Sequence, residues 1–544
     1  MTPLTDLFPP EHLLSRYLNQ EKEIVDLYPG HFQSDKDWES VIQKRMSFPS
    51  DTRKALHSAM VRQNSGISAK TDYNLEQLAK SNTVVIVTGQ QAGFFGGPLY
   101  TLVKTLSAIK WAEELSGRYP KTNFIPVFWL EVEDHDFKEI AIYQQPEKST
   151  LVFPEPETEA YFQISARQIP ESFSDFLDQV ITQLPETDFK ADMVEKLRKS
   201  YQPGDSYASA FLTLARGWFA DYGLLVLNPS DPEIKRLALP LFTKELTSQL
   251  AGKSVSIQTK SMVDRSIPVQ LTPRTVNLFM IRNGKRLGLE LISDNKLKLA
   301  GTDNSFTVEQ VISLINENPG SVSPNVVTRP LFQDTVLPTV GVILGPGEFS
   351  YWGQLKLAYN ETETVMPLCI PRTSGVFVEP AIQRLLEKFG KTPEEIMKNP
   401  DWSEAELKNL SGVDSDLEFR KIKNEFNSLF ADRLPMIKSV DSTLEDTWNG
   451  LTGRTVQSVE QFFSRLEKSV KKSQEVAFGQ MKRLDSSLMP EGKWQERSVS
   501  GLYFLVKYGP DWIKDLYSQV TTEPVFHIFR PSIPNKSNRA EEKK

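Results

Sequence analysis

The sequence predicts an α/β protein with a doubly wound parallel sheet at its core and a helical coiled-coil arm. The first observation is an apolar strand pattern at 83–88 that enters a glycine-rich loop and then a helical pattern at 98–116. The second is another apolar strand at 124–130, so that strand and helix alternate as in parallel sheets. The third is a 4-3-4-3-4 spacing of apolar and small residues from Val459 to Ala477, which indicates a short coiled-coil seam in an arm that would dimerise.

Local composition sets the boundaries that we expect between the parts of the chain. Residues 1–80 look mainly helical, and prolines concentrate in 146–204, which indicates an insert. Asn283 and Gly284 between apolar runs predict a β-hairpin, and short strands are expected at 224–229, 269–271, 326–327 and 340–344. The expected parts are core at 1–145, a first insert at 146–204, core at 205–249, a small β-rich second insert at 250–320, core at 321–379, the arm at 380–490 and a C-terminal helical segment at 491–544 that packs on the core.

The composition of the whole chain argues against several classes of function. With 544 residues the chain is too long for one compact core and should form roughly two to four structural units. A net charge of -7 argues against a general nucleic-acid binder. The single cysteine, Cys369, rules out an intrachain disulfide framework and a Cys-rich zinc site, and it fits a reducing cytoplasm. No signal peptide and no stretch near the ~20 apolar residues of a membrane span is present, so we expect no membrane partner.

The glycine-rich loop at 88–97 is the strongest local signal for a ligand. A strand, a glycine-rich turn and a helix together place backbone N–H groups against a ligand that is often an anion. The loop lacks both the P-loop spacing and the dinucleotide spacing of glycines. A ligand-binding loop and a tight structural turn therefore both remain open.

A cluster of acids follows the second strand, in the segment 131–136. It holds four carboxylates and His135, one of five histidines in the chain. An imidazole beside carboxylates suits general base catalysis, and the same atoms can hold a divalent metal. The alternative is an ordinary acidic helix start, which the helix dipole favours. We do not assign a metal here.

Two later segments add polar groups beside apolar strands. In 328–335, Arg329 can clamp a carboxylate or phosphate, or it can form a structural bridge to an acid. In 345–354 a Gly-Pro-Gly turn leads into a helix whose first turn holds Glu348, which can bind an amine or serve only as an acidic helix start. Tyr351, Trp352 and Gln354 would then form a pocket wall.

Three stretches together resemble the BshC family of bacillithiol biosynthesis, the cysteine-adding ligases. They are VTGQQAGFFGGPLYTLVKT, PVFWLEVEDHDFKEI and NVVTRPLFQDTVLPTVGVILGPGEFSYWGQLK, with weaker matches in MPLCIPRTS and QERSVSGLYFLVKYG. They occur in family order from about residue 83 to 509 and so cover most of the chain. The resemblance implies a Rossmann-like core with two connecting inserts, and a coiled-coil arm that makes a homodimer. The implied reaction joins the carboxyl group of L-cysteine to the amine of glucosaminyl-malate, with ATP or ADP as a possible nucleotide.

The resemblance also carries site residues onto this sequence. Gly89, Gln90, Gln91 and Gly93 would line the pocket, Glu133, Asp134, His135 and Asp136 would form its acidic edge, Arg329, Gln333 and Asp334 would hold the malate-bearing substrate, and Gly347, Glu348 and Tyr351 would close the pocket. As roles, we expect Asp136 or His135 to take a proton from the amine, Arg329 to pair with the malate carboxylates, and backbone N–H groups of 88–93 to stabilise an oxyanion or a phosphate.

One departure concerns the nucleotide. The histidine pair with which class I synthetases handle nucleotides is not visible in 89–97, where glutamines stand instead. A nucleotide would then bind elsewhere, and we place it near Lys507 and Tyr508. Two other functions stay open: another ATP-dependent amide ligase or nucleotidyltransferase on the same core, and a non-catalytic dimeric ligand-binding protein.

Overall fold

The computed structural model describes residues 2–411 and 415–531, and their contacts form two compact units. The first unit comprises Met1–Val378 and Gln495–Lys544, and the second comprises Glu379–Trp494. The range 380–490 expected for the arm lies inside the second unit. Residues 532–544 of the expected C-terminal segment lie outside the described part of the chain.

The first unit is built on a five-stranded sheet whose strands are all parallel. Its order is β13 (Leu368–Pro371), β12 (Thr339–Leu344), β2 (Thr83–Gln91), β3 (Asn123–Glu131) and β6 (Leu225–Leu227). The predicted doubly wound parallel sheet is confirmed. The chain runs outward from β2 through β3 to β6 and then returns to the other side of β2 for β12 and β13. The strand order therefore reverses between β2 and β12, where open α/β sheets bind their ligands.

The helices around this sheet follow from its apolar strands. Val84, Val85, Ile86 and Val87 are fully buried, as expected for a strand that is covered on both faces. The N-terminal helices are α1 (Leu13–Leu18), α2 (Lys22–Val25), α3 (Asp35–Arg45), α4 (Ser50–Asn64) and α5 (Ala69–Leu78). The other helices of the core are α6 (Leu99–Arg118), α7 (Phe137–Ile140), α10 (Tyr207–Phe219), α11 (Pro232–Leu237), α12 (Leu239–Ser248), α15 (Thr328–Val336), α16 (Pro346–Trp352) and α17 (Lys356–Glu361).

The segment 250–324 carries the second sheet of this unit. It begins with α13 (Leu250–Asp264), and its antiparallel strands lie in the order β10 (Ser305–Thr307), β9 (Lys296–Leu299), β8 (Lys285–Ser293), β7 (Leu278–Arg282) and β11 (Val322–Pro324), with α14 (Val308–Glu317) before the last. The predicted hairpin is confirmed: β7 and β8 pair, and Asn283 and Gly284 have φ of +51° and +77° at its turn. In the first insert lie β4 (Ile142–Tyr143), β5 (Leu151–Val152), α8 (Phe173–Gln183) and α9 (Lys190–Ser200).

Two of the strands expected from the sequence are wrong. Residues 269–271 form no strand, because the backbone N–H groups of Gln270 and Leu271 donate to the side-chain oxygen of Gln354 at 2.8 and 2.9 Å. Gln354 is thus a buried structural group rather than part of a pocket wall. Residues 326–327 also form no strand, because the chain there turns into α15.

The C-terminal segment rejoins the first unit after the arm. Its helices are α24 (Gln495–Ser498), α25 (Gly501–Tyr508) and α26 (Trp512–Gln519), which confirms the helical pattern expected there. Strand β15 (Val525–Phe529) pairs with β14 (Ser374–Phe377) and with β1 (Thr2–Pro3) at the start of the chain. The buried guanidinium group of Arg372 donates to both carboxylate oxygens of Glu496, at 2.9 and 2.5 Å.

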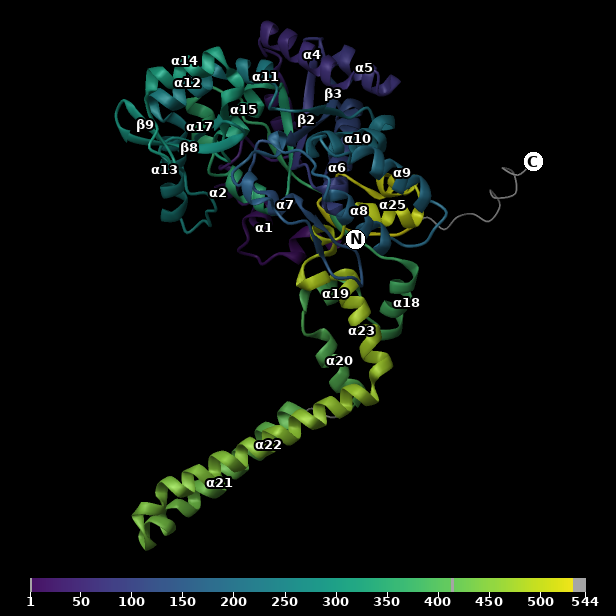
Figure 1. Cartoon of the computed structure of the whole chain (residues 1–544), viewed down its shortest axis with the longest axis vertical. Coiled ribbons are helices and arrows are strands. Elements are labelled where there is room, and N and C mark those ends of the chain that lie inside the picture. The colour runs from purple at the N-terminus through teal and green to yellow at the C-terminus, as the bar shows by residue number, and fades with distance from the viewer. Residues whose placement is uncertain (1, 412–414, 532–544) are drawn as a thin grey trace, which may run out of the picture. The chain divides into compact units, whose positions relative to one another are not determined.

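In the described residues of the second unit, all regular secondary structure is helical. The unit contains α18 (Pro380–Phe389), α19 (Pro393–Lys398), α20 (Trp402–Ser411), α21 (Ser415–Val440), α22 (Glu445–Ser473) and α23 (Glu475–Leu488), and α21 and α22 lie side by side (Figure 1). Phe430 packs against Trp448 with ring centres 4.9 Å apart, and the Trp448 indole donates to the Phe430 carbonyl. Other apolar side chains of this pair of helices are exposed, among them Leu429, Met436, Val440 and Phe462.

No helix in the described residues combines the length and the apolar composition needed to cross a membrane.

The second half of the glycine-rich loop is a structural turn. Phe94 and Phe95 lie in the short helical turn η2 (Phe94–Gly96) and enter an aromatic cluster with residues of the first insert and α10. The backbone N–H of Phe95 donates to the Tyr201 hydroxyl at 2.6 Å. Gly96 has φ of +90°, and a Cβ there would collide with the indole ring of Trp218. Both facts require glycine at this position.

We expect Gly96→Ala to destabilise the first unit by about 1–3 kcal/mol, because it adds a methyl group where φ is positive and an indole ring fills the space. The thermal unfolding midpoint measures this loss. Gly117→Ala in α6 is the matched control, since no atom lies within 4 Å of its added Cβ. It should leave the midpoint unchanged or raise it slightly. Equal midpoints for Gly96→Ala and the unsubstituted protein would contradict the close contact with Trp218.

Candidate active site

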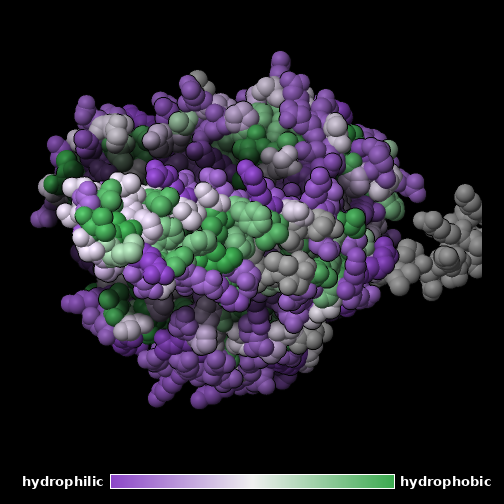
Figure 2. Space-filling view, turned by 90° about the horizontal axis from the view of Figure 1, so that it is seen from below, coloured by the Kyte–Doolittle hydropathy of each residue, from purple (hydrophilic) through white to green (hydrophobic). Residues whose placement is uncertain are grey.

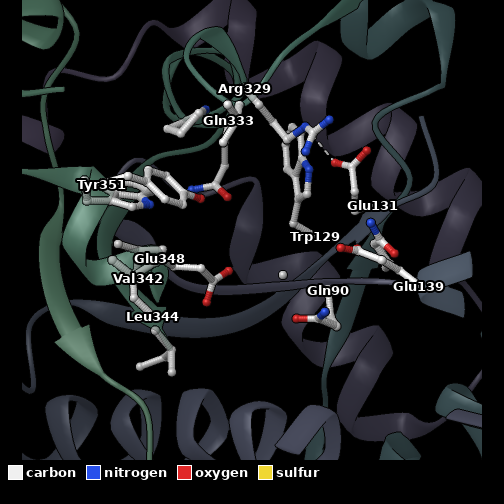
Figure 3. A pocket seen from close by; sticks show the side chains of 16 residues that line it. Gln90, Trp129, Glu131, Glu139, Arg329, Gln333, Val342, Leu344, Glu348 and Tyr351 are labelled. Atoms are coloured by element: carbon white, nitrogen blue, oxygen red, sulfur yellow. Dashed lines mark ion pairs between the residues drawn. The ribbon is translucent and has the colours of Figure 1, made fainter. Parts of the chain in front are cut away.

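A pocket of about 170 Å³ opens at the carboxyl ends of β2, β3 and β12, where the strand order reverses. Helices α15 and α16 and the short helix α7 complete its walls. Figure 3 shows Glu348 and Tyr351 on one side and the pair of Arg329 and Glu131 on the other. Of the residues expected from the sequence, the pocket brings together Gly89, Gln90, Gln91, Arg329, Gln333, Glu348 and Tyr351.

The ammonium group of Lys104 anchors one side of this pocket. Lys104 lies on α6 with its side chain almost fully buried, and its Nζ donates to the Gly89 carbonyl at 2.8 Å and to Glu348 Oε2 at 2.6 Å. The same Glu348 oxygen accepts from the backbone N–H of Gly345 at 2.7 Å. Burial lowers the pKa of Lys104, although the Glu348 carboxylate beside it acts in the opposite direction. Lys104 thus fixes Glu348 against the end of β2.

Arg329 anchors the opposite side. Its Nε lies 2.8 Å from Glu131 Oε2, and its Nη2 lies 4.0 Å from Asp134 Oδ2. The register of β2 and β3 places Gln91 directly opposite Glu131, and this is the last position at which the two strands pair. The ion pair of Arg329 and Glu131 therefore lies at the carboxyl end of β3. The indole N–H of Trp129 is buried at the pocket wall and has no hydrogen-bond partner in the described part of the chain. It is a donor available to a ligand.

Two other acids of the 131–136 segment, Glu133 and Asp134, are held by cations from distant elements. Glu133 is buried and pairs with Lys235 of α11, which is equally buried. Asp134 accepts from Arg286 of β8 at 3.3 Å and from the backbone N–H of His135 at 2.7 Å. Burial alone would raise the pKa of Asp134, but the contacts with His135 and the arginine charges outweigh it and hold that pKa well below its ordinary value. These carboxylates are structural anchors.

His135 and Asp136, the expected proton acceptors, do not line the pocket. His135 is partly buried, with its Nδ1 3.3 Å from an Arg286 nitrogen, and Asp136 is exposed at the start of α7. Glu139, one turn further along α7, lines the pocket. Burial raises the pKa of Glu139, and the charges of Asp136 and Asp134 add to this effect.

Three further expected residues lie outside the pocket walls. The carboxylate of Asp334 is fully buried and accepts from the Tyr359 hydroxyl at 2.5 Å and from the Gln333 amide at 3.0 Å. Gly93 donates its backbone N–H to the Gln91 carbonyl at 2.8 Å, in the tight turn before η2. Gly347 lies in the first turn of α16. Their roles in binding remain predictions.

Lys507 and Tyr508 lie on α25, and neither lines the pocket described above. The Lys507 ammonium donates to the Tyr503 hydroxyl at 2.8 Å, and the Tyr508 ring packs against Phe377. A separate cavity of about 470 Å³ includes Leu505 of the same helix. Its walls also contain Trp218, Tyr222, Lys196, Lys199 and Lys514.

Sequence reasoning missed Lys104, Trp129 and Glu139. Lys104 sits on an otherwise apolar helical pattern one to two turns after the loop, and a buried charge in that place signals a polar partner. Glu139 follows Asp136 by three residues, which on a helix puts both on neighbouring positions of one face. This three-residue spacing is the sequence signal that could have identified Glu139. The signal for Trp129 was weak, because an indole at the end of a buried strand is ordinary core.

The arrangement suits a polar ligand that carries a carboxylate, hydroxyl groups and an amine. Arg329 supplies a guanidinium group with free edges, and Gln90, Gln91 and Gln333 supply amides. Among the described residues no group of three or more His, Cys, Asp or Glu side chains is placed to hold a metal ion.

Comparison with known families gives two matches that together span the chain. The model described as Bacillithiol biosynthesis BshC, N-terminal Rossmann-like domain, matches residues 4–373. The model described as Bacillithiol biosynthesis BshC, C-terminal coiled-coil domain, matches residues 375–528. The pocket lies entirely within the first match.

Curated proteins with similar sequences carry the name "Putative cysteine ligase BshC". The protein from Salinibacter ruber is 31% identical over 519 residues, which is 94% of each chain. The protein from Chloroherpeton thalassium is 32% identical and covers 85% of this chain and 86% of its own. The protein from Chlorobaculum tepidum is 30% identical over the same shares.

We expect Glu133→Gln to destabilise the first unit by about 3–5 kcal/mol, because it leaves the buried Lys235 ammonium without a carboxylate. The urea midpoint of unfolding measures the loss. The double variant Glu133→Gln, Lys235→Met removes both charges and should recover most of the stability. If the double variant is as unstable as the sum of its single variants, the two residues do not form a coupled pair.

Proposed function

We propose, from the premise that this chain belongs to the BshC family of bacillithiol biosynthesis, that it is a cysteine ligase. It joins the carboxyl group of L-cysteine to the amine of glucosaminyl-malate and forms an amide bond in the last step of that synthesis. The observation that carries the proposal is the pocket at the reversal of strand order, where an anchored arginine faces an anchored glutamate. The names of the relatives support the same reaction.

The malate end of the acceptor would bind at Arg329. Its Nε lies 2.8 Å from a Glu131 oxygen, and among the described residues no carboxylate lies closer than 4.0 Å to its other nitrogens, so their N–H groups can donate to a substrate carboxylate. Gln333, one turn along α15, lines the same wall and can donate its amide to the ligand. Because Glu131 holds the guanidinium in place, little side-chain entropy is lost when the carboxylate binds.

The sugar would lie between the two anchored sides. Gln90 and Gln91 at the end of β2 offer amides to hydroxyl groups, and the Gln90 amide is itself held by the Tyr100 hydroxyl at 2.8 Å. Glu348, fixed by Lys104, can accept from a hydroxyl or from the ammonium form of the amine. The indole N–H of Trp129 supplies a further donor.

ATP is part of this proposal, because a carboxylate must be activated before an amine can displace its oxygen. Lys507 and Tyr508 mark the helix near which we place the nucleotide. The cavity of about 470 Å³ beside that helix supports this position, since Trp218 suits a stacked base and Lys196 suits a phosphate group; its other two lysines, Lys199 and Lys514, are paired with Glu195 and Asp511.

A homodimer in the cytoplasm completes the proposal. The exposed apolar side chains of α21 and α22 support an arm that pairs with a second copy. Hydrophobic side chains also gather in a band on the face shown in Figure 2. The buried, unpaired Cys369 fits a reducing compartment.

Purified protein given glucosaminyl-malate, cysteine and ATP should form the cysteinyl amide, detected by mass spectrometry. Omission of ATP should abolish the product. Arg329→Gln should raise the KM for the acceptor about 10–100-fold, because one charge-assisted pair is lost, whereas glucosamine without malate should be used equally poorly by both proteins.

Other outcomes decide between the remaining functions. A product formed only with another acid or amine indicates a different amide ligase, and pyrophosphate release with nucleotidyl transfer indicates a nucleotidyltransferase. Tight acceptor binding without any product in the presence of ATP would replace the ligase with a binding protein.

We expect the double variant Leu429→Asp, Phe462→Asp to convert a dimer into monomers, because it places charges in the apolar surface of the arm. Light scattering after size exclusion measures the mass. Asn424→Asp, also exposed on α21, adds a charge without removing an apolar group and should remain dimeric. A dimer that survives the double variant must be held by another surface.

A further inference from the structure

Amide formation from an amine needs a proton acceptor in the pocket. At neutral pH an alkyl amine is mostly an ammonium ion, which has no lone pair with which to attack a carbonyl carbon. The acceptor must therefore lose a proton at a group that can reach it. This requirement rests on the proposed function and narrows the search to basic groups that line the pocket.

Three carboxylates line the pocket, and two of them are already paired with cations. Glu131 lies 2.8 Å from Arg329, and Glu348 lies 2.6 Å from Lys104. Each of these two carboxylates is therefore engaged in an ion pair, although burial raises the pKa of Glu131 despite the opposing charge of Arg329. Glu139 is the pocket carboxylate that, within the described residues, has no cation within 4.0 Å.

The surroundings of Glu139 hold it at the pocket wall without neutralising it. Phe137 and Ile140 of α7 are buried and fix the helix to the core. Figure 3 shows Glu139 on the side of Gln90 and Glu131, with Glu348 across the pocket. This places a carboxylate that has no paired cation among the described residues at the pocket wall.

The charged groups that face Glu139 act together on its pKa. Glu139 is an exposed residue, but partial burial of its carboxylate against the pocket raises that pKa, and the carboxylates of Asp136 and Asp134 raise it further. A hydrogen bond with Gln91 and the charge of Arg329 act in the opposite direction but do not outweigh them. A raised pKa makes a carboxylate a better match for a base that works near neutral pH.

We propose that Glu139 is the catalytic base that deprotonates the acceptor amine. An N–H bond of the ammonium group breaks, its electron pair stays on nitrogen, and the proton forms an O–H bond with the Glu139 carboxylate. The products of this step are a neutral amine with a free lone pair and a neutral carboxylic acid. The amine nitrogen then attacks the carbonyl carbon of the cysteine carboxyl group that ATP has activated. The bond from that carbon to the oxygen of the phosphoryl or adenylyl group breaks, and this group leaves with the electron pair as phosphate or AMP and takes up the second proton from the nitrogen.

The proposed base is thus Glu139, and not His135 or Asp136, the residues that the acidic motif indicated. His135 and Asp136 do not line the pocket, whereas Glu139 does. In the proposed arrangement Asp136 acts on Glu139 through its charge. It is a positioning and tuning residue.

The test compares Glu139→Gln with the unsubstituted protein in the ligase assay. The amide keeps the size and the hydrogen bond to Gln91 but cannot accept the proton. We expect kcat to fall about 10²–10⁴-fold and the fall in rate on the acidic side of the pH profile to disappear, because no carboxylate remains to be protonated there. Glu171→Gln, an exposed glutamate of the first insert, is the control and should keep the normal rate and profile.

Two outcomes would overturn the inference. A normal kcat in Glu139→Gln would exclude Glu139 as the base. If the fall in rate at acidic pH disappears in Asp136→Asn but persists in Glu139→Gln, Asp136 is the catalytic base.

Calorimetry separates this inference from the proposed function. Glu139→Gln should weaken binding of glucosaminyl-malate about 5–10-fold, because an ammonium–carboxylate contact is lost, and should leave binding of the N-acetylated acceptor unchanged. If the unsubstituted protein makes no product, the ligase reaction is refuted. If Glu139→Gln nevertheless shows this selective loss of binding, Glu139 still lies at the amine. Equal losses for both acceptors, or none, would refute the contact itself.

Discussion

The need to compensate buried carboxylates at the end of one strand organises the first unit. Each acid there is met by a cation from a different part of the chain: Arg329 of α15, Lys235 of α11 and Arg286 of β8. A buried carboxylate without its cation costs several kcal/mol, so these elements must close on β3 for the fold to be stable. The second sheet and two helices are thereby brought to the edge where the pocket lies. The same pairs that secure the fold also build the walls of the site.

The carboxylates that line the pocket have two different roles. Glu131 and Glu348 form ion pairs that hold the structure, whereas Glu139 has no paired cation among the described residues. Glu131 and Glu348 are neutralised by neighbours and present fixed, preorganised surfaces. The glycine-rich loop divides in the same way: Gly89 and the two glutamines line the pocket, whereas Phe94 and Phe95 enter the aromatic core of the first insert. The two explanations considered for this loop therefore apply to its two halves.

The sequence predicted the core elements well because buried parallel strands are continuous apolar runs that local periodicity reveals. Examples are the strand expected at 83–88, which is observed as Thr83–Gln91, the helix that follows it and the Asn283-Gly284 hairpin. The strand expected at 269–271 was wrong because a single distant side chain, Gln354, satisfies its backbone. Lys104 was missed for the same reason: its role depends on Glu348, 244 positions away, and no local pattern contains that partner.

Because the chain returns to the first unit only after the arm, part of that unit can fold only late in the synthesis of the protein. Arg372 meets its carboxylate only at Glu496, the backbone N–H of Leu99 at the start of α6 meets its carbonyl only at Val499, and β1 meets its neighbour only at β15. All of the arm must therefore leave the ribosome before the core can close, a delay on the order of ten seconds at bacterial elongation rates. During that interval the edge of β14 and the guanidinium group of Arg372 lack the partners that they have in the folded unit.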